Sequence, residues 1–148
     1  MADVYSSNYN NFSWCSQSSA TCLSNQYDSW STATNDIAGI ANTDALVSHK
    51  NHTHAAANGA RNYNYTVTHP TGTSEWFLPS AGQWMKMQTA AGSYANLCNS
   101  VNMNSSNYYW SSTERTKYYA WRSYYTGTSS TTSVYKGNGN KVRACLAF

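Results

Sequence analysis

The sequence predicts an α+β domain with two or three short helices, a small, mainly antiparallel sheet and much irregular loop. Helical patterns lie in the first two thirds of the chain, whereas segments rich in aromatic and β-branched residues lie after residue 108. Helices followed by strands, rather than alternating with them, indicate this fold class. The length of 148 residues is that of one domain, so we expect residues 1–148 to form a single domain.

The composition indicates a folded protein and argues against two classes of partner. Charged residues make up only 10% of the chain, but 13 Tyr and 6 Trp supply a large apolar surface that disordered chains lack. The net charge of +3 is small and no run of Lys or Arg occurs, so we expect no nucleic-acid binding. No stretch approaches the roughly 18–20 apolar residues of a membrane span, so we expect no membrane insertion. No signal peptide is visible.

Residues 1–35 are polar and rich in turn-forming residues. Their aromatic residues are expected to anchor irregular packing, with at most one edge strand: Tyr5, Phe12, Trp14 and Trp30. Two short helices are expected next. Thr43 is placed to cap a helix over residues 44–47, and an alanine-rich stretch from Thr53 to about Asn62 predicts another, although Gly59 weakens it.

The segment 76–91 carries the strongest local signals. Residues 76–78, Trp-Phe-Leu, form a short apolar run that predicts a buried strand. Ser80 and Gln83 have the spacing of a capping box, in which each side chain bonds to the other's backbone N–H. Trp84, Met87 and Ala91 then recur at the spacing of one helical face, so we expect that face to pack on the core.

Three later segments have the composition of strands: 109–113, 120–125 and 141–148. Residues 137–140, Gly-Asn-Gly-Asn, predict the turn before the last of them. That last segment alternates, which predicts one face of Val142, Ala144, Leu146 and Phe148 and another of Lys141, Arg143 and Cys145.

Four blocks of sequence occur in a characteristic order. They are Trp76–Trp84 (WFLPSAGQW), Tyr109–Glu114 (YWSSTE), Ala120-Trp121, and Lys141–Ala144 (KVRA) shortly before Phe148. In this order the blocks resemble the C-type-lectin-like domains of the formylglycine-generating-enzyme type. More closely, they resemble the variable proteins of diversity-generating retroelements of phages and bacteria. The resemblance covers roughly residues 30–148 and implies a C-type-lectin-like fold.

In that family a fixed scaffold carries a C-terminal segment that is hypermutated at adenines of a template RNA, so that Asn codons become Tyr, Ser, Thr, Arg or Gly codons, among others. Outside the quoted blocks, the segment of about 102–140 has that composition here. Tyr offers a large, stiff, amphipathic contact, and Ser, Gly and Asn adapt around it, as in antibody paratopes. The resemblance implies a hypervariable receptor-type protein of a phage tail or bacterial surface. Its ligand would be a macromolecule, protein or glycan, on a target cell surface.

The same resemblance places the ligand-binding residues in four stretches of the chain. They are Tyr108 before the Trp110 strand; Arg115, Thr116, Lys117, Tyr118 and Tyr119 in the following turn; Arg122, Tyr124 and Tyr125 on or after the Trp121 strand; and Thr128, Ser130, Ser133 and Tyr135 in the loop before the final strand. Strand alternation puts Arg122 and Tyr124 on the face opposite Trp121. Because Trp121 is expected in the core, Arg122 and Tyr124 are expected to point outward.

The remaining aromatic residues of the blocks are expected to form the scaffold: Trp76, Trp84, Trp110, Trp121 and Phe148, together with Val142. Glu114 is expected to hold the end of the sheet through a hydrogen bond or by pairing with Arg143. The alternative to a receptor is a structural fimbrial or virion component that assembles through the same surface.

The cysteines and histidines give no recognisable metal pattern in sequence. Cys15, Cys22, Cys98 and Cys145 allow two disulfides in three connectivities, and both buried thiols and one local Cys15–Cys22 bridge stay open. No two cysteines lie within four residues of one another, as a zinc pattern requires. We expect no nearby Cys or acid to complete a set of metal ligands with His49, His52 and His54, and therefore solvated or helix-capping histidines and no metal.

Calcium-dependent sugar binding and catalysis are not expected either. Calcium sites need several oxygen ligands together, but Glu114 is the one acid in the binding half of the sequence, and the lectin patterns Glu-Pro-Asn and Trp-Asn-Asp are absent. Formylglycine-generating enzymes use a cysteine pair in the C-terminal region, whereas Cys145 stands alone on the last strand and every His lies at or before His69. The sequence thus predicts neither an enzyme nor a cofactor.

Overall fold

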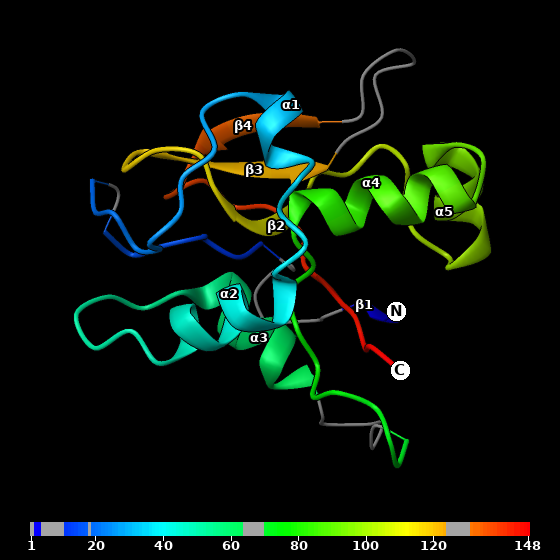
Figure 1. Ribbon diagram of the computed structural model, residues 1–148, viewed down its shortest axis with the longest axis horizontal. Helices are drawn as coiled ribbons and strands as arrows, with labels where there is room; N and C mark the ends of the chain where they lie inside the picture. The colour runs from blue at the N-terminus through cyan, green and yellow to red at the C-terminus, as the bar shows by residue number, and fades with distance from the viewer. Residues whose placement is uncertain (1, 4–10, 18, 64–69, 124–130) are drawn as a thin grey trace.

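The computed structural model describes the chain apart from residues 1, 4–10, 18, 64–69 and 124–130 (Figure 1). In chain order the elements are β1 (Ala2–Asp3), α1 (Trp30–Ala33), α2 (Gly39–Val47), α3 (Ala55–Arg61), α4 (Ala81–Ala90), α5 (Tyr94–Ser100), β2 (Tyr109–Glu114), β3 (Tyr119–Ser123), β4 (Thr131–Tyr135) and β5 (Arg143–Ala144). The protein is therefore α+β with five helices in the described residues, where the sequence predicted two or three.

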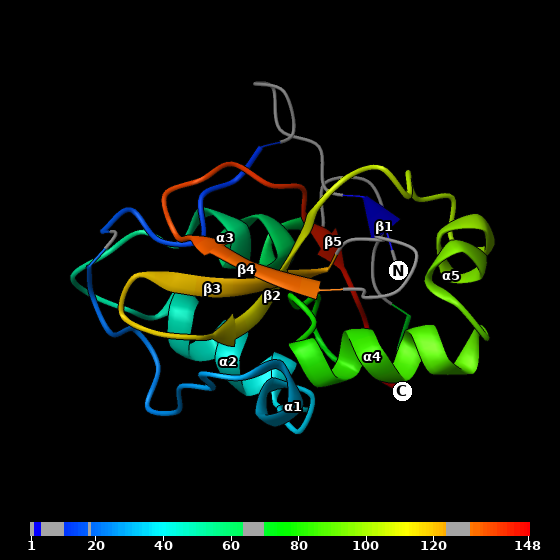
Figure 2. The same ribbon diagram turned by 90° about the horizontal axis from the view of Figure 1, so that it is seen from above.

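The main sheet is antiparallel, with the strand order β2-β3-β4. Viewed from above, the three strands lie side by side, and a second, two-stranded ribbon of β1 and β5 lies apart from them (Figure 2). In the β3–β4 pair Tyr119 lies opposite Tyr135, and Arg122 lies opposite Thr132. The interpretation of residues 131–135 as loop was wrong. This stretch forms a ladder with β3, because its Thr and Val residues suit a strand as soon as a partner edge is present.

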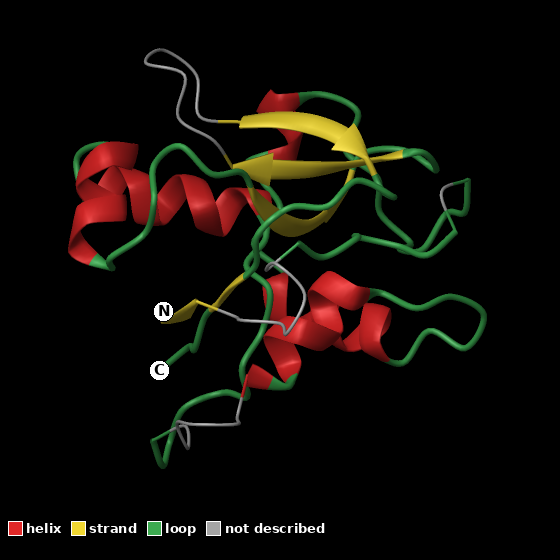
Figure 3. Ribbon diagram, turned by 180° about the vertical axis from the view of Figure 1, so that it is seen from behind, coloured by secondary structure: helices red, strands yellow, loops and turns green. Residues whose placement is uncertain are grey.

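The helices cover the sheet from two sides. α2 and α3 pack against each other, and α2 also packs on β2. α4 packs on β2 and β3, and α5 lies against α4. Figure 3 shows the sheet above the α2–α3 pair, with α4 and α5 to one side. Because both faces of β2 are covered, all six of its residues are buried.

Three groups of buried side chains form the core, and the four tryptophans predicted to be scaffold lie in them. Trp76 and Trp110 pack with Trp14 and the alanines of α3. Trp84 packs between α4, α5 and β2, against Tyr94 and Tyr109. Trp121 packs on Ala33 and Ala81, close to α1 and the start of α4. The tryptophans therefore pack between the sheet and the helices and stabilise the core.

The capping box predicted at α4 is confirmed. The backbone N–H of Gln83 donates to Ser80 Oγ at 3.4 Å, and the backbone N–H of Ser80 donates to Gln83 Oε1 at 2.9 Å. Met87 and Ala91 pack against the same cluster as Trp84, as the helical spacing predicted. The helix predicted from residue 53 to about 62 is confirmed: it is α3, which is slightly shorter than predicted.

The other helix predictions need correction. α2 begins at Gly39, so Thr43 lies inside the helix and does not cap it. Its hydroxyl donates to the carbonyl of Gly39 at 2.7 Å and accepts from the backbone N–H of Leu78 at 3.0 Å, tying α2 to the segment before α4. α1 and α5 were not predicted, because helices of 4 and 7 residues leave little periodicity to detect.

The C-terminal segment departs most from its predicted alternation. Its regular strand is only β5, paired with β1, and Phe77 forms a single bridge with Cys145. Arg143 and Cys145 are buried as fully as Val142 and Ala144, because chain packs on both sides of the segment. Phe148 is fully exposed, so its assignment to the scaffold was wrong. The run at 76–78 is buried but forms only this bridge.

Candidate functional site

Three tyrosines of the predicted ligand-binding set meet at one end of the sheet. Tyr118 lies in the turn between β2 and β3, Tyr119 begins β3 and Tyr135 ends β4; we call them the tyrosine patch. Their side chains are 40%, 41% and 40% exposed. The rings of Tyr119 and Tyr135, which face each other across the strand pair, meet edge to face with centroids 6.2 Å apart. Large aromatic rings are thus presented to solvent on a rigid edge.

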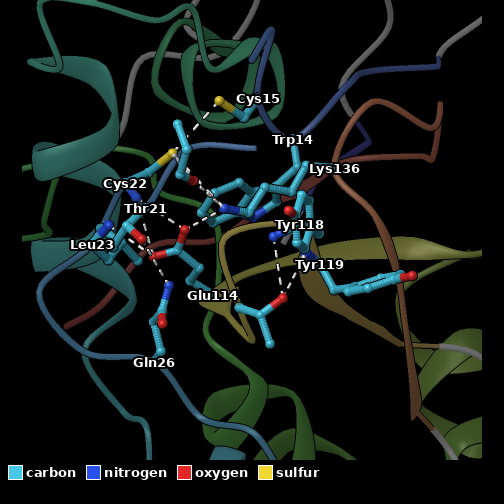
Figure 4. Close-up of polar contacts among 12 residues, drawn as sticks. Trp14, Cys15, Thr21, Cys22, Leu23, Gln26, Glu114, Tyr118, Tyr119 and Lys136 are labelled. Atoms are coloured by element: carbon cyan, nitrogen blue, oxygen red, sulfur yellow. Dashed lines mark hydrogen bonds and ion pairs between the residues drawn. The ribbon is translucent and has the colours of Figure 1, made fainter. Parts of the chain in front are cut away.

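The turn that carries the tyrosine patch is held by its own backbone. The N–H groups of Arg115 and Thr116 both donate to the carbonyl of Tyr119, at 2.9 and 3.1 Å. The hydroxyl of Thr116 accepts from the N–H groups of Tyr118 and Tyr119, at 3.1 and 3.2 Å (Figure 4). Thr116, predicted as a contact residue, therefore shapes the turn.

Two cations of the predicted set flank the tyrosine patch. Arg115 donates to Ser133 Oγ at 2.7 Å and to Asp28, and its guanidinium lies 5.4 Å from the centre of the Trp121 ring. Lys117 is exposed, with its ammonium 4.9 Å from the centre of the Tyr118 ring. Arg115 and Ser133 are thus hydrogen-bonded to each other, whereas the ammonium of Lys117 and the tyrosine rings are accessible to a ligand.

Tyr108 and Arg122 form a second group on the opposite face of β3. The guanidinium of Arg122 lies 3.5 Å from the centre of the Tyr108 ring and donates to Thr132 Oγ1 and Asn140 Oδ1, both at 3.0 Å. Burial lowers the pKa of Arg122, although a guanidinium stays charged. Arg122 and Trp121 do lie on opposite faces, but Arg122 is half-buried, so its expected outward position was wrong. Tyr124, Tyr125, Thr128 and Ser130 lie outside the described residues.

A buried ion pair lies directly beneath the tyrosine patch. Glu114, the last residue of β2, pairs with Lys136, the residue after β4, and both side chains are fully buried. The carboxylate also accepts from the backbone N–H groups of Cys22 and Leu23, each at 2.9 Å, and the ammonium donates to the carbonyl of Ala20 at 2.7 Å. The hydrogen bonds expected of Glu114 are confirmed, but its ionic partner is Lys136 and not Arg143.

This pair joins three parts of the chain. Residues 20–23 bind its polar atoms, and the ammonium of Lys136 lies 5.0 Å from the centre of the Trp14 ring. The backbone N–H of Lys136 donates to the carbonyl of Tyr118 at 3.0 Å, and that of Trp14 donates to the carbonyl of Lys136 at 2.8 Å. The pair thus fixes the N-terminal segment and the turn bearing Tyr118 in one position.

Sequence reasoning missed Lys136 altogether. A lysine directly before Gly-Asn-Gly has the local pattern of an exposed turn, and the average lysine is exposed. The one available signal was that Glu114 ends a strand that carries the core residue Trp110, because a buried carboxylate requires a partner of opposite charge. That signal predicts a cation near Glu114 but does not identify the residue that supplies it.

Cys15, Cys22 and His54 lie together beside the ion pair. All four cysteines are free thiols, and the sulfurs of Cys15 and Cys22 are 3.5 Å apart (Figure 4). The hydrogen bond between them lowers the pKa of Cys15 to about 4 and raises that of Cys22. One ligand atom of each of the three residues lies within 4.8 Å of the other two. The expectation that no Cys accompanies the histidines was therefore wrong.

Of the three histidines, His54 is not the solvated or capping residue that was expected, whereas His49 and His52 are half-buried. His54 precedes α3, but its fully buried side chain makes no capping hydrogen bond to that helix. The rings of His49 and His52 stack with centroids 4.9 Å apart, and His49 also meets the edge of His54 at 5.3 Å. The cluster is thus packed into the domain.

A hollow of about 200 Å³ lies between the start of α4 and the C-terminal segment, lined among others by Phe77, Met87 and Cys145. Burial raises the pKa of Cys145 to about 12, so its sulfur stays protonated at neutral pH. A protonated thiol is a weak nucleophile, and the hollow therefore offers apolar surface rather than reactive chemistry.

Comparisons with known proteins bear on the fold. No protein-family profile and no curated protein sequence matches the chain. The crystal structure of a fimbrial protein from Bacteroides ovatus is similar, with a TM-score of 0.60 at 20% identity over 93% of this chain. The match covers 33% of that protein, so the chain spans about a third of its length. At this identity the likeness shows the α+β fold. No helix within the described residues is long and apolar enough to cross a membrane.

Proposed function

We propose that this chain is a ligand-binding, receptor-type domain that recognises a protein or glycan through the tyrosine patch and Lys117. The observation that carries the proposal is the exposure of Tyr118, Tyr119 and Tyr135 at one end of the sheet. Tyr119 and Tyr135 lie on paired strands, and the turn that holds Tyr118 is fixed by hydrogen bonds to Thr116. Buried Tyr and Arg residues supply much of the binding energy at protein interfaces. A fixed backbone adds to affinity because little conformational freedom is lost on binding.

The proposal includes a C-type-lectin-like fold and diversification by a retroelement, at a phage tail or a bacterial surface. It is supported by the separation of buried from exposed positions within residues 102–140. Tryptophans of the quoted blocks are buried, while Lys117, Tyr118 and Tyr135, which lie between the blocks, are exposed. A scaffold that tolerates variation needs this separation of core positions from surface positions.

Replacing Tyr118, Tyr119 and Tyr135 together by Ala is expected to abolish binding without unfolding the domain. A tyrosine that acts as a hot spot contributes about 2 kcal/mol, or roughly 30-fold in affinity, so losing three should lower affinity by at least about 1,000-fold. The labelled intact chain is tested on an array of bacterial surface glycans and on a panel of intact bacteria. Positive targets are then measured with the triple variant.

Ile37→Ala is the matched control, because Ile37 is a large apolar side chain that is 55% exposed far from the tyrosine patch in sequence. It should leave binding unchanged. The proposal fails if the triple variant binds as the wild type does, or if it loses its melting transition, because the tyrosines would then be structural.

The proposed diversification predicts a specific feature of the neighbouring DNA. A near-identical repeat of the segment encoding roughly Asn104–Phe148 should lie beside a reverse-transcriptase gene and differ from it mainly at adenines. Sequencing the flanking DNA tests this directly. If the flanking DNA contains no such repeat, diversification by a retroelement is excluded, but the proposed binding surface is unaffected.

A structural role in a fimbria or virion is the second candidate, favoured by the likeness to a fimbrial protein. In that case the same surface would be consumed by contacts between subunits. Light scattering separates the two: a wild-type chain that stays monomeric at high concentration supports the receptor. Assembly that is lost in the triple tyrosine variant supports the structural component.

A further inference from the structure

Cys15, Cys22 and His54 come from three separate places and converge in the interior beside Trp14. Cys15 follows Trp14 in the N-terminal segment, Cys22 lies in the loop before α1, and His54 directly precedes α3. One ligand atom from each lies within 4.8 Å of the other two, and the two sulfurs are 3.5 Å apart. Two thiols and an imidazole are the side chains that zinc prefers.

The hydrogen bond made by His54 leaves one ring nitrogen free. Nδ1 lies 3.0 Å from the carbonyl oxygen of Trp14. A carbonyl can only accept, so Nδ1 carries a proton, and in the neutral ring Nε2 then keeps its lone pair. Nε2 is buried and has no hydrogen-bond partner among the described residues. Histidines that bind metals commonly donate their other N–H to a backbone carbonyl in this way.

A metal ion accounts for this arrangement better than a disulfide does. A Cys15–Cys22 disulfide would join the sulfurs at about 2.05 Å and leave Nε2 of His54 buried without a partner. Tetrahedral zinc with Zn–S bonds of about 2.3 Å holds two sulfurs about 3.8 Å apart, close to the 3.5 Å seen here. The metal also gives Nε2 the partner that buried polar atoms normally have.

We propose that Cys15 Sγ, Cys22 Sγ and His54 Nε2 bind one Zn²⁺ ion. Two thiolates and a neutral imidazole balance the charge of the ion, as a buried ion requires. The described residues contribute no further His, Cys, Asp or Glu to the group, and Cys22 is only partly buried. Water therefore takes the fourth position. The ammonium of Lys136 lies 4.0 Å from Cys22 Sγ.

The backbone holds the ligands in place before the metal arrives. The N–H of Ser16 donates to the carbonyl of Thr53 at 2.8 Å, and the N–H of Thr53 returns a bond to Ser16 Oγ at 2.9 Å. The N–H of Ala56 donates to the carbonyl of Ser13 at 3.0 Å. These bonds flank Cys15 and His54 on both sides, so the ion would lock the N-terminal segment onto the start of α3.

Zinc titration of the reduced, metal-stripped full chain, in competition with a chromophoric chelator, tests the site. The wild type should bind one equivalent. Cys15→Ser, Cys22→Ser and His54→Gln should each lower the zinc affinity on the order of 100-fold or more, in line with losses seen even for residues around metal ligands. Cys98→Ser is the matched control, because Cys98 is a buried thiol in a different core cluster, and it should bind zinc as the wild type does.

Cobalt provides a measurement that does not depend on the stability of any variant. The wild type loaded with Co²⁺ should show thiolate-to-metal charge-transfer absorption and the visible spectrum of a tetrahedral site.

The proposal is overturned if the reduced wild type takes up less than one equivalent of zinc, or if Cys98→Ser weakens binding as much as Cys15→Ser. A Cys15–Cys22 disulfide found by mass mapping of the unreduced protein would overturn it as well.

Discussion

Replacing Lys136 by Met should lower the free energy of unfolding by about 3–5 kcal/mol, because it leaves the Glu114 carboxylate buried without a counter-ion. Both side chains of the pair are fully buried. The ammonium also donates to the carbonyl of Ala20, and the variant would lose this hydrogen bond as well. Because the pair lies under the turn that carries Tyr118, the same variant should loosen the tyrosine patch.

A double variant separates the charge from the hydrogen bonds. Glu114→Gln together with Lys136→Met removes both charges, while the Gln side-chain oxygen can still accept from the backbone N–H groups of Cys22 and Leu23. The double variant should therefore recover more than half of the stability lost in Lys136→Met. Denaturant unfolding followed by tryptophan fluorescence measures all three proteins.

The control for this series is Lys50→Met, since Lys50 is exposed and such positions usually change stability by less than about 0.5 kcal/mol. If Lys136→Met is no less stable than Lys50→Met, the buried pair does not hold the N-terminal segment. If the double variant is as unstable as the single one, the loss comes from packing rather than from an unpaired charge.

The features that sequence reasoning predicted correctly depend on short stretches of chain. The capping box of Ser80 and Gln83 involves residues three apart, and its geometry follows from the start of one helix. The burial of Trp110 and Trp121 follows from strand composition, since large aromatic residues on strands that are covered by helices pack into the core. The resemblance placed Tyr118 correctly in the turn after β2, but it placed Tyr119 in that turn and Tyr135 in a loop, whereas these two residues lie on β3 and β4.

The features that were missed depend on contacts between distant residues. Lys136 is buried because residues 20–23 fold over it, more than a hundred positions away in sequence. The thiols of Cys15 and Cys22 meet His54 because residues 13–16 pair with residues 53–56. Arg122 is half-buried because Asn140 and Tyr108 lie beside its strand. Each of these depends on how loops cross the sheet, which alternation and spacing within one segment do not determine.

Gly82→Ala should destabilise the domain by about 3 kcal/mol or more, although the substitution favours helix formation. Ala in place of Gly stabilises a helix interior by about 1 kcal/mol. At this position, however, a Cβ atom would stand 2.4 Å from the carbonyl oxygens of both Thr34 and Asp36. Forcing atoms into packed space typically costs about 1–3 kcal/mol, and more where the neighbour is backbone.

The backbone at Asp36 cannot withdraw to make room for that Cβ. Its carbonyl accepts from the N–H of Gly82 at 2.9 Å and from Ser80 Oγ at 2.6 Å, and its carboxylate accepts from Thr113 Oγ1 at 2.6 Å, so α4, the preceding segment and β2 all hold it. Gly137→Ala is the control, since the nearest atom to its Cβ is a Tyr135 ring carbon at 3.6 Å, an ordinary contact. Thermal unfolding should show a large fall in melting temperature for Gly82→Ala and almost none for Gly137→Ala. A Gly82→Ala protein as stable as the wild type would mean that the close approach of α4 to residues 34–36 is not part of the fold.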